Sequence, residues 1–267
     1  MKQRTLATAA LWALVILLLL LLGKWGAFLL VAVFGCGAFI ELLGLLRQSG
    51  QAPEARIAVP AFILLLGSFI FIPPWVLPPI ALVMPVLVGT CAACLFLHRT
   101  GFPSFLMLTL GSLTLVILPF GTLSLIIHES GLVLTIWVLA VTKFSDVGAL
   151  LTGMAIGKNK MAPRFSPNKT WEGLAGGLLL AVIVSVLFVL FGQKWLPVAL
   201  TPLHAAWTAL FIALAGVLGD LTESALKREA GTKDSGKAIP GIGGFLDLTD
   251  SMLLAFPTAY LLLWIVI

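Results

Sequence analysis

The chain has 267 residues, of which 60% are hydrophobic and only 10% are charged, and its mean hydropathy is +1.14. Soluble domains carry about a quarter of their residues as charged side chains, so this composition argues against a soluble protein and indicates an integral membrane protein. The formal charge of +5 does not indicate nucleic-acid binding, because no basic stripe with interleaved aromatic residues accompanies it. We therefore expect no nucleic-acid partner.

Apolar runs recur along the chain at a length that fits membrane helices. A hydrocarbon core about 30 Å thick needs about 20 apolar residues per helix, which predicts an all-α integral membrane protein with about nine transmembrane helices. The first run is too long for the apolar part of a signal peptide, so we expect it to be retained. Pro119 and its neighbouring glycines could break the fifth run. The runs lie at residues 6–22, 25–46, 57–72, 76–97, 104–127, 131–152, 173–192, 203–219 and 251–267.

The positions of the basic residues predict the orientation in the membrane. With a cytoplasmic N-terminus, 13 of the 16 lysines and arginines fall in cytoplasmic loops, only Lys24 and Lys194 fall opposite, and Lys143 lies within the sixth run. Cytoplasmic loops are typically rich in Lys and Arg. The sequence therefore predicts a multi-pass protein of the inner (cytoplasmic) membrane, with its C-terminus on the opposite side and its active site facing the cytoplasm.

Charges are concentrated in the second half of the chain. The stretches 143–172 and 220–250 together hold 17 of the 27 charged residues. We therefore predict N-terminal transmembrane helices over 1–130 and a catalytic transmembrane region over 131–267, with cytoplasmic loops at 153–172 and 220–250.

The segment "GDLTESALKREAGTKD" carries acids followed by cations. If the eighth helix continues through it, Asp220, Glu223 and Lys227 share one face, which suits a divalent cation beside phosphates. A solvated helix end with ordinary ion pairs is the alternative. Further on, "DLTD" places Asp247 and Asp250 at the start of the last helix, where they would either cap it or bind metal. We expect Asp220 and Asp247 to meet across the glycine-rich loop around Mg²⁺.

The upstream polar segment begins inside an apolar run. Lys143 and Asp146 form either a neutralising pair or part of a site. Lys169 precedes a helix start and suits nucleotide phosphates. Gly173 and Gly177 form a G-x-x-x-G pattern, which predicts close helix packing.

These two segments resemble the phosphatidate cytidylyltransferases, the membrane-bound CDP-diacylglycerol synthases. The family signature S-x-x-K-R, K-D, a glycine-rich stretch and D-R-x-D matches here at Ser224, Lys227, Arg228, Lys233, Asp234, Gly241, Gly243, Gly244, Asp247 and Asp250. An upstream block matches at Asp146, Gly148, Gly157, Ser166, Pro167, Lys169, Thr170, Trp171, Glu172 and Gly173. Two positions depart from the pattern: Ile242 stands where the family has histidine, and Leu248 where it has arginine.

The resemblance implies transfer of a cytidylyl group from CTP to phosphatidate, with Mg²⁺ as cofactor. The implied partners are CTP, phosphatidate or a related lipid phosphate, and membrane lipids, with a homodimer left open. Open alternatives are a weakened or specialised paralogue acting on another lipid phosphate, a non-enzymatic lipid-binding or partner-binding membrane protein, and a transporter. The implied catalytic residues are Asp220, Lys227, Arg228, Lys233, Asp234 and Asp247; the substrate-binding residues are Asp146, Lys169, Ser224, Lys227, Arg228, Gly243 and Gly244; the metal ligands are Asp220, Glu223, Asp247 and Asp250.

Overall fold

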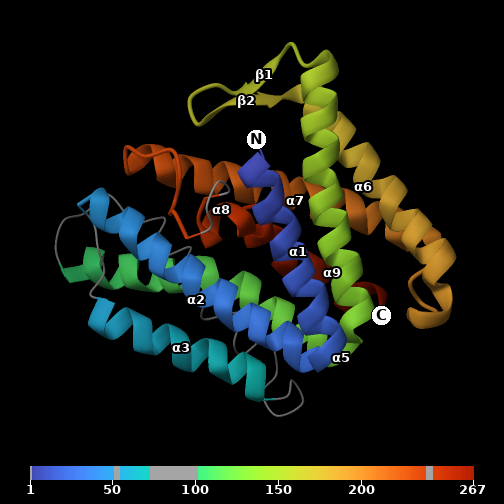
Figure 1. Cartoon of the computed structure of the whole chain (residues 1–267), viewed down its shortest axis with the longest axis horizontal. Helices are drawn as coiled ribbons and strands as arrows, with labels where there is room; N and C mark the ends of the chain where they lie inside the picture. The colour runs from blue at the N-terminus through green and yellow to red at the C-terminus, as the bar shows by residue number, and fades with distance from the viewer. Residues whose placement is uncertain (1, 51–54, 73–101, 239–242) are drawn as a thin grey trace. The chain divides into compact units, whose positions relative to one another are not determined.

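The computed structural model describes residues 2–50, 55–72, 102–238 and 243–267, and its described part is almost entirely helical (Figure 1). The chain forms two compact units. The first consists of Met1–Glu129 and Leu226–Thr249, and the second of Ser130–Ala225 and Asp250–Ile267. The helix predicted at 76–97 lies outside the described residues, and the division into regions 1–130 and 131–267 stays a prediction.

The first unit is built around α2. This helix packs against α1, α3 and the short helix α8. The contact with α3 includes the stacked rings of Phe39 and Phe62, whose centroids lie 4.2 Å apart. The helices of this unit begin and end as follows: α1 Lys2–Leu22, α2 Lys24–Gln48, α3 Ala55–Phe71, the first half of α5, whose full range is Phe102–Ile156, and α8 Phe245–Thr249.

The second unit contains the rest of α5 together with the longest helices of the second half. A break at Gly131, with φ of 76°, separates the two halves of α5, whereas the helix continues through Pro119. The hairpin of β1 and β2 joins α5 to α6 where the sequence predicted a loop. The elements are β1 Lys160–Ala162, β2 Ser166–Thr170, α6 Trp171–Gly192, a 3₁₀ turn at Gln193–Trp195, α7 Pro202–Glu229 and α9 Met252–Val266.

Thr170 and the glycines after it fix the junction between the hairpin and α6. The Thr170 hydroxyl accepts a hydrogen bond from the Gly173 backbone N–H at 3.1 Å, which caps the helix N-terminus. A Cβ at Gly173 or Gly177 would lie 2.8 Å from a backbone oxygen of α5. The predicted role of the G-x-x-x-G pattern in close helix packing is therefore confirmed.

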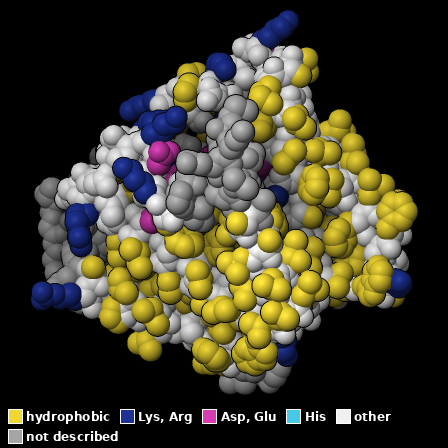
Figure 2. All heavy atoms as spheres, viewed as in Figure 1, with side chains coloured by type: hydrophobic (Ala, Val, Ile, Leu, Met, Phe, Trp, Pro, Cys, Tyr) yellow, Lys and Arg dark blue, Asp and Glu magenta, His cyan; other side chains and the backbone are white. Residues whose placement is uncertain are grey.

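The helices have the length and surface of membrane spans. Within the described residues, five helices are long and apolar enough to cross a membrane: Lys24–Gln48, Gly111–Ile156, Trp171–Trp195, Pro202–Glu229 and Phe245–Val266. Hydrophobic side chains gather over the visible face, including that of α6 (Figure 2). On α6 the exposed ones are Leu179, Ile183, Leu187, Leu190 and Phe191. Since water would not favour such a surface, the protein is a multi-pass membrane protein, as predicted.

Candidate active site

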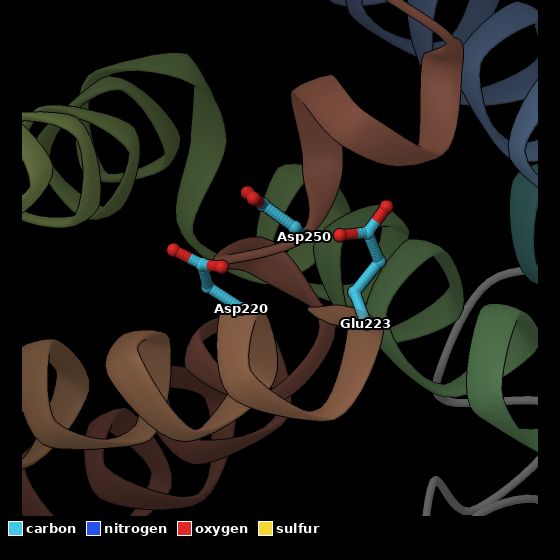
Figure 3. Close-up of side chains that lie close together, drawn as sticks. All are labelled: Asp220, Glu223 and Asp250. Atoms are coloured by element: carbon cyan, nitrogen blue, oxygen red, sulfur yellow. The ribbon is translucent and has the colours of Figure 1, made fainter. Parts of the chain in front are cut away.

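Three carboxylates of the second unit lie close together (Figure 3). Asp220 and Glu223 come from α7, and Asp250 comes from the turn between α8 and α9. One carboxylate oxygen from each lies within 4.8 Å of the other two. Glu223 is completely buried, and the two aspartates are partly exposed. Such a group of negative oxygens is the ligand type that hard divalent cations prefer.

Glycines on α7 let this cluster form. A Cβ at Gly219 would lie 2.6 Å from the Asp250 backbone oxygen, and one at Gly216 would lie 3.5 Å from the Ser251 backbone oxygen. Any larger residue at position 219 would push α7 away from the turn before α9. The glycine directly before Asp220 therefore brings the carboxylates of two segments together.

Two lysines and a serine surround the acidic cluster. Lys169 donates to Asp220 across 2.8 Å, and both side chains are largely buried. Asp146 lies 3.6 Å from Lys143 and accepts a hydrogen bond of 2.9 Å from the Ser251 hydroxyl. Lys143 donates to the same hydroxyl at 3.2 Å. The predicted pair of Lys143 and Asp146 is confirmed, and it belongs to a wider polar network.

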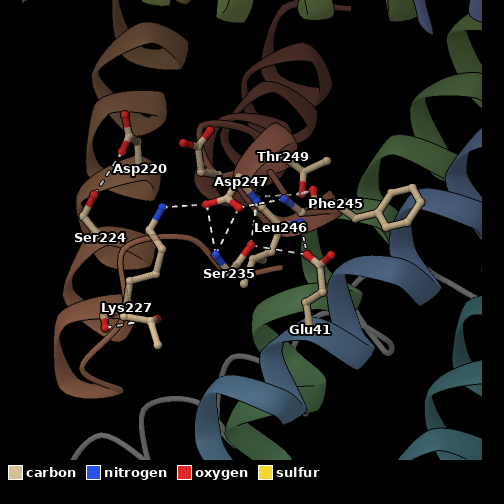
Figure 4. Close-up of polar contacts among 12 residues, drawn as sticks. Glu41, Asp220, Ser224, Lys227, Ser235, Phe245, Leu246, Asp247 and Thr249 are labelled. Atoms are coloured by element: carbon tan, nitrogen blue, oxygen red, sulfur yellow. Dashed lines mark hydrogen bonds and ion pairs between the residues drawn. The ribbon is translucent and has the colours of Figure 1, made fainter. Parts of the chain in front are cut away.

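A second polar cluster lies in the first unit, around Asp247 (Figure 4). One oxygen of this carboxylate pairs with Lys227 at 2.8 Å, and both side chains are only 13% exposed. The other oxygen accepts the backbone N–H groups of Gly244 at 2.8 Å and Ser235 at 3.0 Å. Asp247 thus caps α8 from within its first turn, which is the capping role considered from the sequence.

Gly243 packs closely against Asp247, and Gly244 donates its backbone N–H to the Asp247 carboxylate. Gly243 has φ of 131°, a conformation that other residues rarely adopt, and a Cβ there would lie 2.7 Å from an Asp247 carboxylate oxygen. These two predicted substrate-binding glycines therefore shape the capping turn.

The predicted site residues divide between the two units. The second unit holds Asp146, Lys169, Asp220, Glu223, Ser224 and Asp250, and the first holds Lys227, Arg228, Lys233, Asp234, Gly243, Gly244 and Asp247. Of these, Arg228, Lys233 and Asp234 are exposed. The continuation of the eighth predicted helix is confirmed, because α7 runs to Glu229. The shared metal site of Asp220 and Asp247 stays a prediction, since the two belong to different units.

Several details complete this placement. Ser224 donates to Asp220 at 3.3 Å, and Arg228 donates to the Thr232 backbone oxygen at 3.2 Å. Ile242, one of the two departures from the family pattern, lies outside the described residues, whereas Leu248 is partly buried on α8.

Sequence reasoning did not single out Glu41. This acid lies inside the apolar helix α2 and accepts hydrogen bonds from the Leu246 backbone N–H and the Ser235 hydroxyl. The sequence does mark this residue, because Glu41 is the only acidic residue in the apolar run 25–46. An ionisable residue within a membrane helix is costly and usually functional.

The fold and the two clusters define a class of protein: a multi-pass membrane protein with carboxylates and lysines gathered on and beside its helices. The sequence profile of the cytidylyltransferase family matches residues 2–266. The chain therefore belongs to the cytidylyltransferase family and is a nucleotidyltransferase.

Two of the three relatives described next are named phosphatidate cytidylyltransferase. The phosphatidate cytidylyltransferase of Bacillus subtilis is 33% identical over 98% of this chain and 97% of its own length. That of Haemophilus influenzae is 42% identical over 48% of this chain and 44% of its own length. The uncharacterized protein YnbB of Escherichia coli is 39% identical over 49% of this chain and 43% of its own length. The last two matches thus span about half of this chain and less than half of each relative.

Proposed function

We propose that this protein transfers the cytidylyl group of CTP to phosphatidate and so produces CDP-diacylglycerol and pyrophosphate for phospholipid biosynthesis. Support comes from membership of the cytidylyltransferase family and from the relative named phosphatidate cytidylyltransferase that matches nearly the whole chain. A protein embedded by apolar helices meets a lipid substrate in the bilayer and a nucleotide from water.

The observation that carries the proposal is the charge balance of the polar network in the second unit. Four carboxylates, those of Asp146, Asp220, Glu223 and Asp250, accompany the two ammonium groups of Lys143 and Lys169. Carboxylates thus outnumber ammonium groups two to one among these six residues, which favours a cation there. Because all the acidic donors are carboxylate oxygens, the residues fit Mg²⁺ better than a thiol-seeking metal.

Asp220, Glu223 and Asp250 would hold the cation, and Mg²⁺ bound there would supply positive charge to the phosphate oxygens of CTP. This assignment gives Asp250 the place that the sequence predicted for Asp247. Asp247 is instead the partner of Lys227, and it holds that ammonium group at a defined position.

The reaction needs positioning and charge neutralisation more than proton transfer. A non-bridging oxygen of the lipid phosphate attacks the α-phosphorus of CTP, and the bond from that phosphorus to the bridging oxygen of the β-phosphate breaks. Pyrophosphate leaves with the bonding electrons. Since a phosphate monoester is already anionic at neutral pH, no side chain has to remove a proton. Lys169, Lys227, Arg228 and Lys233 would neutralise the triphosphate and the lipid phosphate.

Purified protein, CTP and phosphatidate test this function directly. Label at the α-phosphate of CTP should appear in the lipid fraction, and label at the γ-phosphate should appear in pyrophosphate. A panel of other lipid phosphates tests for a specialised lipid preference. Glu229→Gln, which changes an exposed acid at the end of α7, is the matched control and should keep activity. Absence of labelled lipid with every lipid phosphate would refute the proposal.

We further propose that the protein crosses the inner membrane nine times, with a cytoplasmic N-terminus and its polar loops on the cytoplasmic side. The distribution of lysine and arginine supports this orientation. Cysteine substitutions at exposed positions of the β1–β2 hairpin, such as Arg164, should react with a membrane-impermeant thiol reagent only after cells are opened. Labelling in intact spheroplasts would contradict the orientation.

A further inference from the structure

We propose that Glu41 is a positioning residue that clasps the glycine-rich loop, of which the structure describes residues 233–238 and 243–249 in the first unit, onto α2 and so sets the place of the charged groups on these residues. The kinetic part of this inference rests on the proposed cytidylyl transfer. The structural part does not, because the clasp is a set of contacts within the first unit.

The clasp begins with hydrogen bonds to a single oxygen of Glu41 (Figure 4). Glu41 Oε2 accepts the backbone N–H of Leu246 at 2.8 Å and the hydroxyl of Ser235 at 3.3 Å. These two donors are 11 positions apart in the loop (246 − 235), so one carboxylate joins the beginning of the loop to its end. Within an apolar helix such bonds are strong, since competing water is scarce.

Glycines let the loop approach this carboxylate. A Cβ at either Gly236 or Gly244 would overlap a Glu41 carboxylate oxygen. A side chain at either position would therefore displace the Glu41 carboxylate, since the three nearest atoms at both positions all belong to Glu41. The same reasoning applies one turn earlier on α2, where a Cβ at Gly37 would overlap the ring of Phe245. Gly37 and Glu41 are four residues apart and so form one face of α2 that receives α8.

Ser235 links the clasp to the paired charges. Its hydroxyl donates to Glu41 and accepts from the Asp247 backbone N–H at 3.2 Å, while its own N–H donates to the Asp247 carboxylate. Asp247 in turn holds Lys227. A change at Glu41 should therefore reach Lys227 through Ser235 and Asp247 without any direct contact. The loop also carries Lys233, which the family likeness assigns to phosphate binding.

Hydrogen–deuterium exchange tests the clasp without substrate. In the full-length protein in detergent, Glu41→Ala should speed exchange of the Leu246 and Ser235 amides about tenfold or more. The Leu246 amide loses its hydrogen-bond acceptor, and Ser235 loses the acceptor that holds its hydroxyl in place. Glu41→Gln should stay close to wild type, since a single carbonyl oxygen can accept both bonds. Gly44→Ala is the control: it lies on α2 with nothing within 4 Å of the added Cβ.

Kinetics test the positioning role. Glu41→Ala should lower kcat/KM for CTP by about tenfold to a hundredfold, the usual effect of losing a hydrogen bond to a charged group, with an increased KM. The half-saturating Mg²⁺ concentration should not change, because the acidic cluster belongs to the other unit. A variant that is merely misfolded would lose both properties together.

A double variant separates the clasp from general damage. Gly236→Ala should be as defective as Glu41→Ala, because the new methyl group displaces the carboxylate. Adding Gly236→Ala to Glu41→Ala should cost nothing further, since the overlap has gone. Three outcomes would each overturn the proposal. Amide exchange could be unchanged in Glu41→Ala, Glu41→Gln could be as defective as Glu41→Ala, or the losses caused by Glu41→Ala and Gly236→Ala could multiply in the double variant. If wild type makes no CDP-lipid, the proposed function fails, and the exchange measurements still decide the clasp.

Discussion

Replacing Asp250 by asparagine should remove most of the stabilisation of the protein by Mg²⁺. The reasoning starts from the distances, since the oxygens of Asp220, Glu223 and Asp250 lie within 4.8 Å of one another. At that separation, two unit charges in an effective dielectric of about 20 repel by roughly 3.5 kcal/mol. The lysine beside Asp220 offsets part of this repulsion. Asp250→Asn removes two of the three pairwise repulsions, so the metal-free variant should be at least as stable as wild type.

The expected size of the metal effect follows from mass action. A cation at about 100 times its Kd stabilises the folded state by about 2.7 kcal/mol. For a chain of this length, that corresponds to an increase in Tm of about 5–10 °C. In Asp250→Asn the cluster loses one ligand and one charge, so its Tm should rise by no more than about 2 °C.

Tryptophan fluorescence during thermal unfolding in detergent measures both values, because the chain contains 8 tryptophans. Each variant is compared in EDTA and across a series of Mg²⁺ concentrations. Glu229→Gln changes an exposed carboxylate on the same helix as Asp220 and should behave like wild type. Equal Mg²⁺-dependent shifts in wild type and Asp250→Asn, or no shift in wild type, would refute the assignment of the cation to this cluster.

Four other substitutions test the remaining contacts. Lys227→Met or Asp247→Asn alone should destabilise the protein by about 3–5 kcal/mol, because each breaks a buried ion pair and leaves one of its charges. The double variant should recover most of that stability in thermal unfolding, whereas its activity should stay lost. Lys169→Met should lower kcat/KM for CTP about a hundredfold. It should not weaken activation by Mg²⁺, because Lys169 competes with the cation for the Asp220 carboxylate. Weaker activation by Mg²⁺ in this variant would contradict the assignment. Gly177→Ala should cost about 1–3 kcal/mol of stability, because its methyl group meets a backbone oxygen of α5. Gly192→Ala is the matched control, since the neighbours of its methyl group lie at 3.6 Å or more. Equal Tm values for the two variants would contradict the packing argument.

The apolar runs predicted most of the described helices because hydrophobic length is nearly sufficient to specify a membrane span. The break in α5 at Gly131 falls where the sequence placed the boundary between the fifth and sixth runs, at 127 and 131. The possible break at Pro119 was wrong, because α5 continues through it. A proline removes a single backbone N–H, so the other hydrogen bonds of the helix can still form. Gly131, with φ of 76°, adopts a conformation that ends a helix.

The sequence predicted which acidic residues belong to the site but not which of them lie close together. Helical periodicity places Asp220 and Glu223 on one face of α7, as the structure has them. Asp247 and Asp250 are three residues apart, and either could have joined them. The choice depends on the short helix α8, which ends at Thr249 and leaves Asp250 in the following turn beside Asp220. A turn of this kind leaves no periodic signal in the sequence.

Charges inside apolar helices were the most informative positions in this chain. Placing such a side chain at the centre of a bilayer costs about 2.5–3.5 kcal/mol, so each requires a compensating partner. Glu41 has partners at Ser235, before α8, and at Leu246 on α8, and Asp146 has its partner at Ser251, directly before α9. In both cases the compensating group comes from a segment far away in the sequence. A helix with such a charge is therefore more stable in the membrane once the C-terminal segments have folded against it, which links assembly of the helices to assembly of the polar clusters.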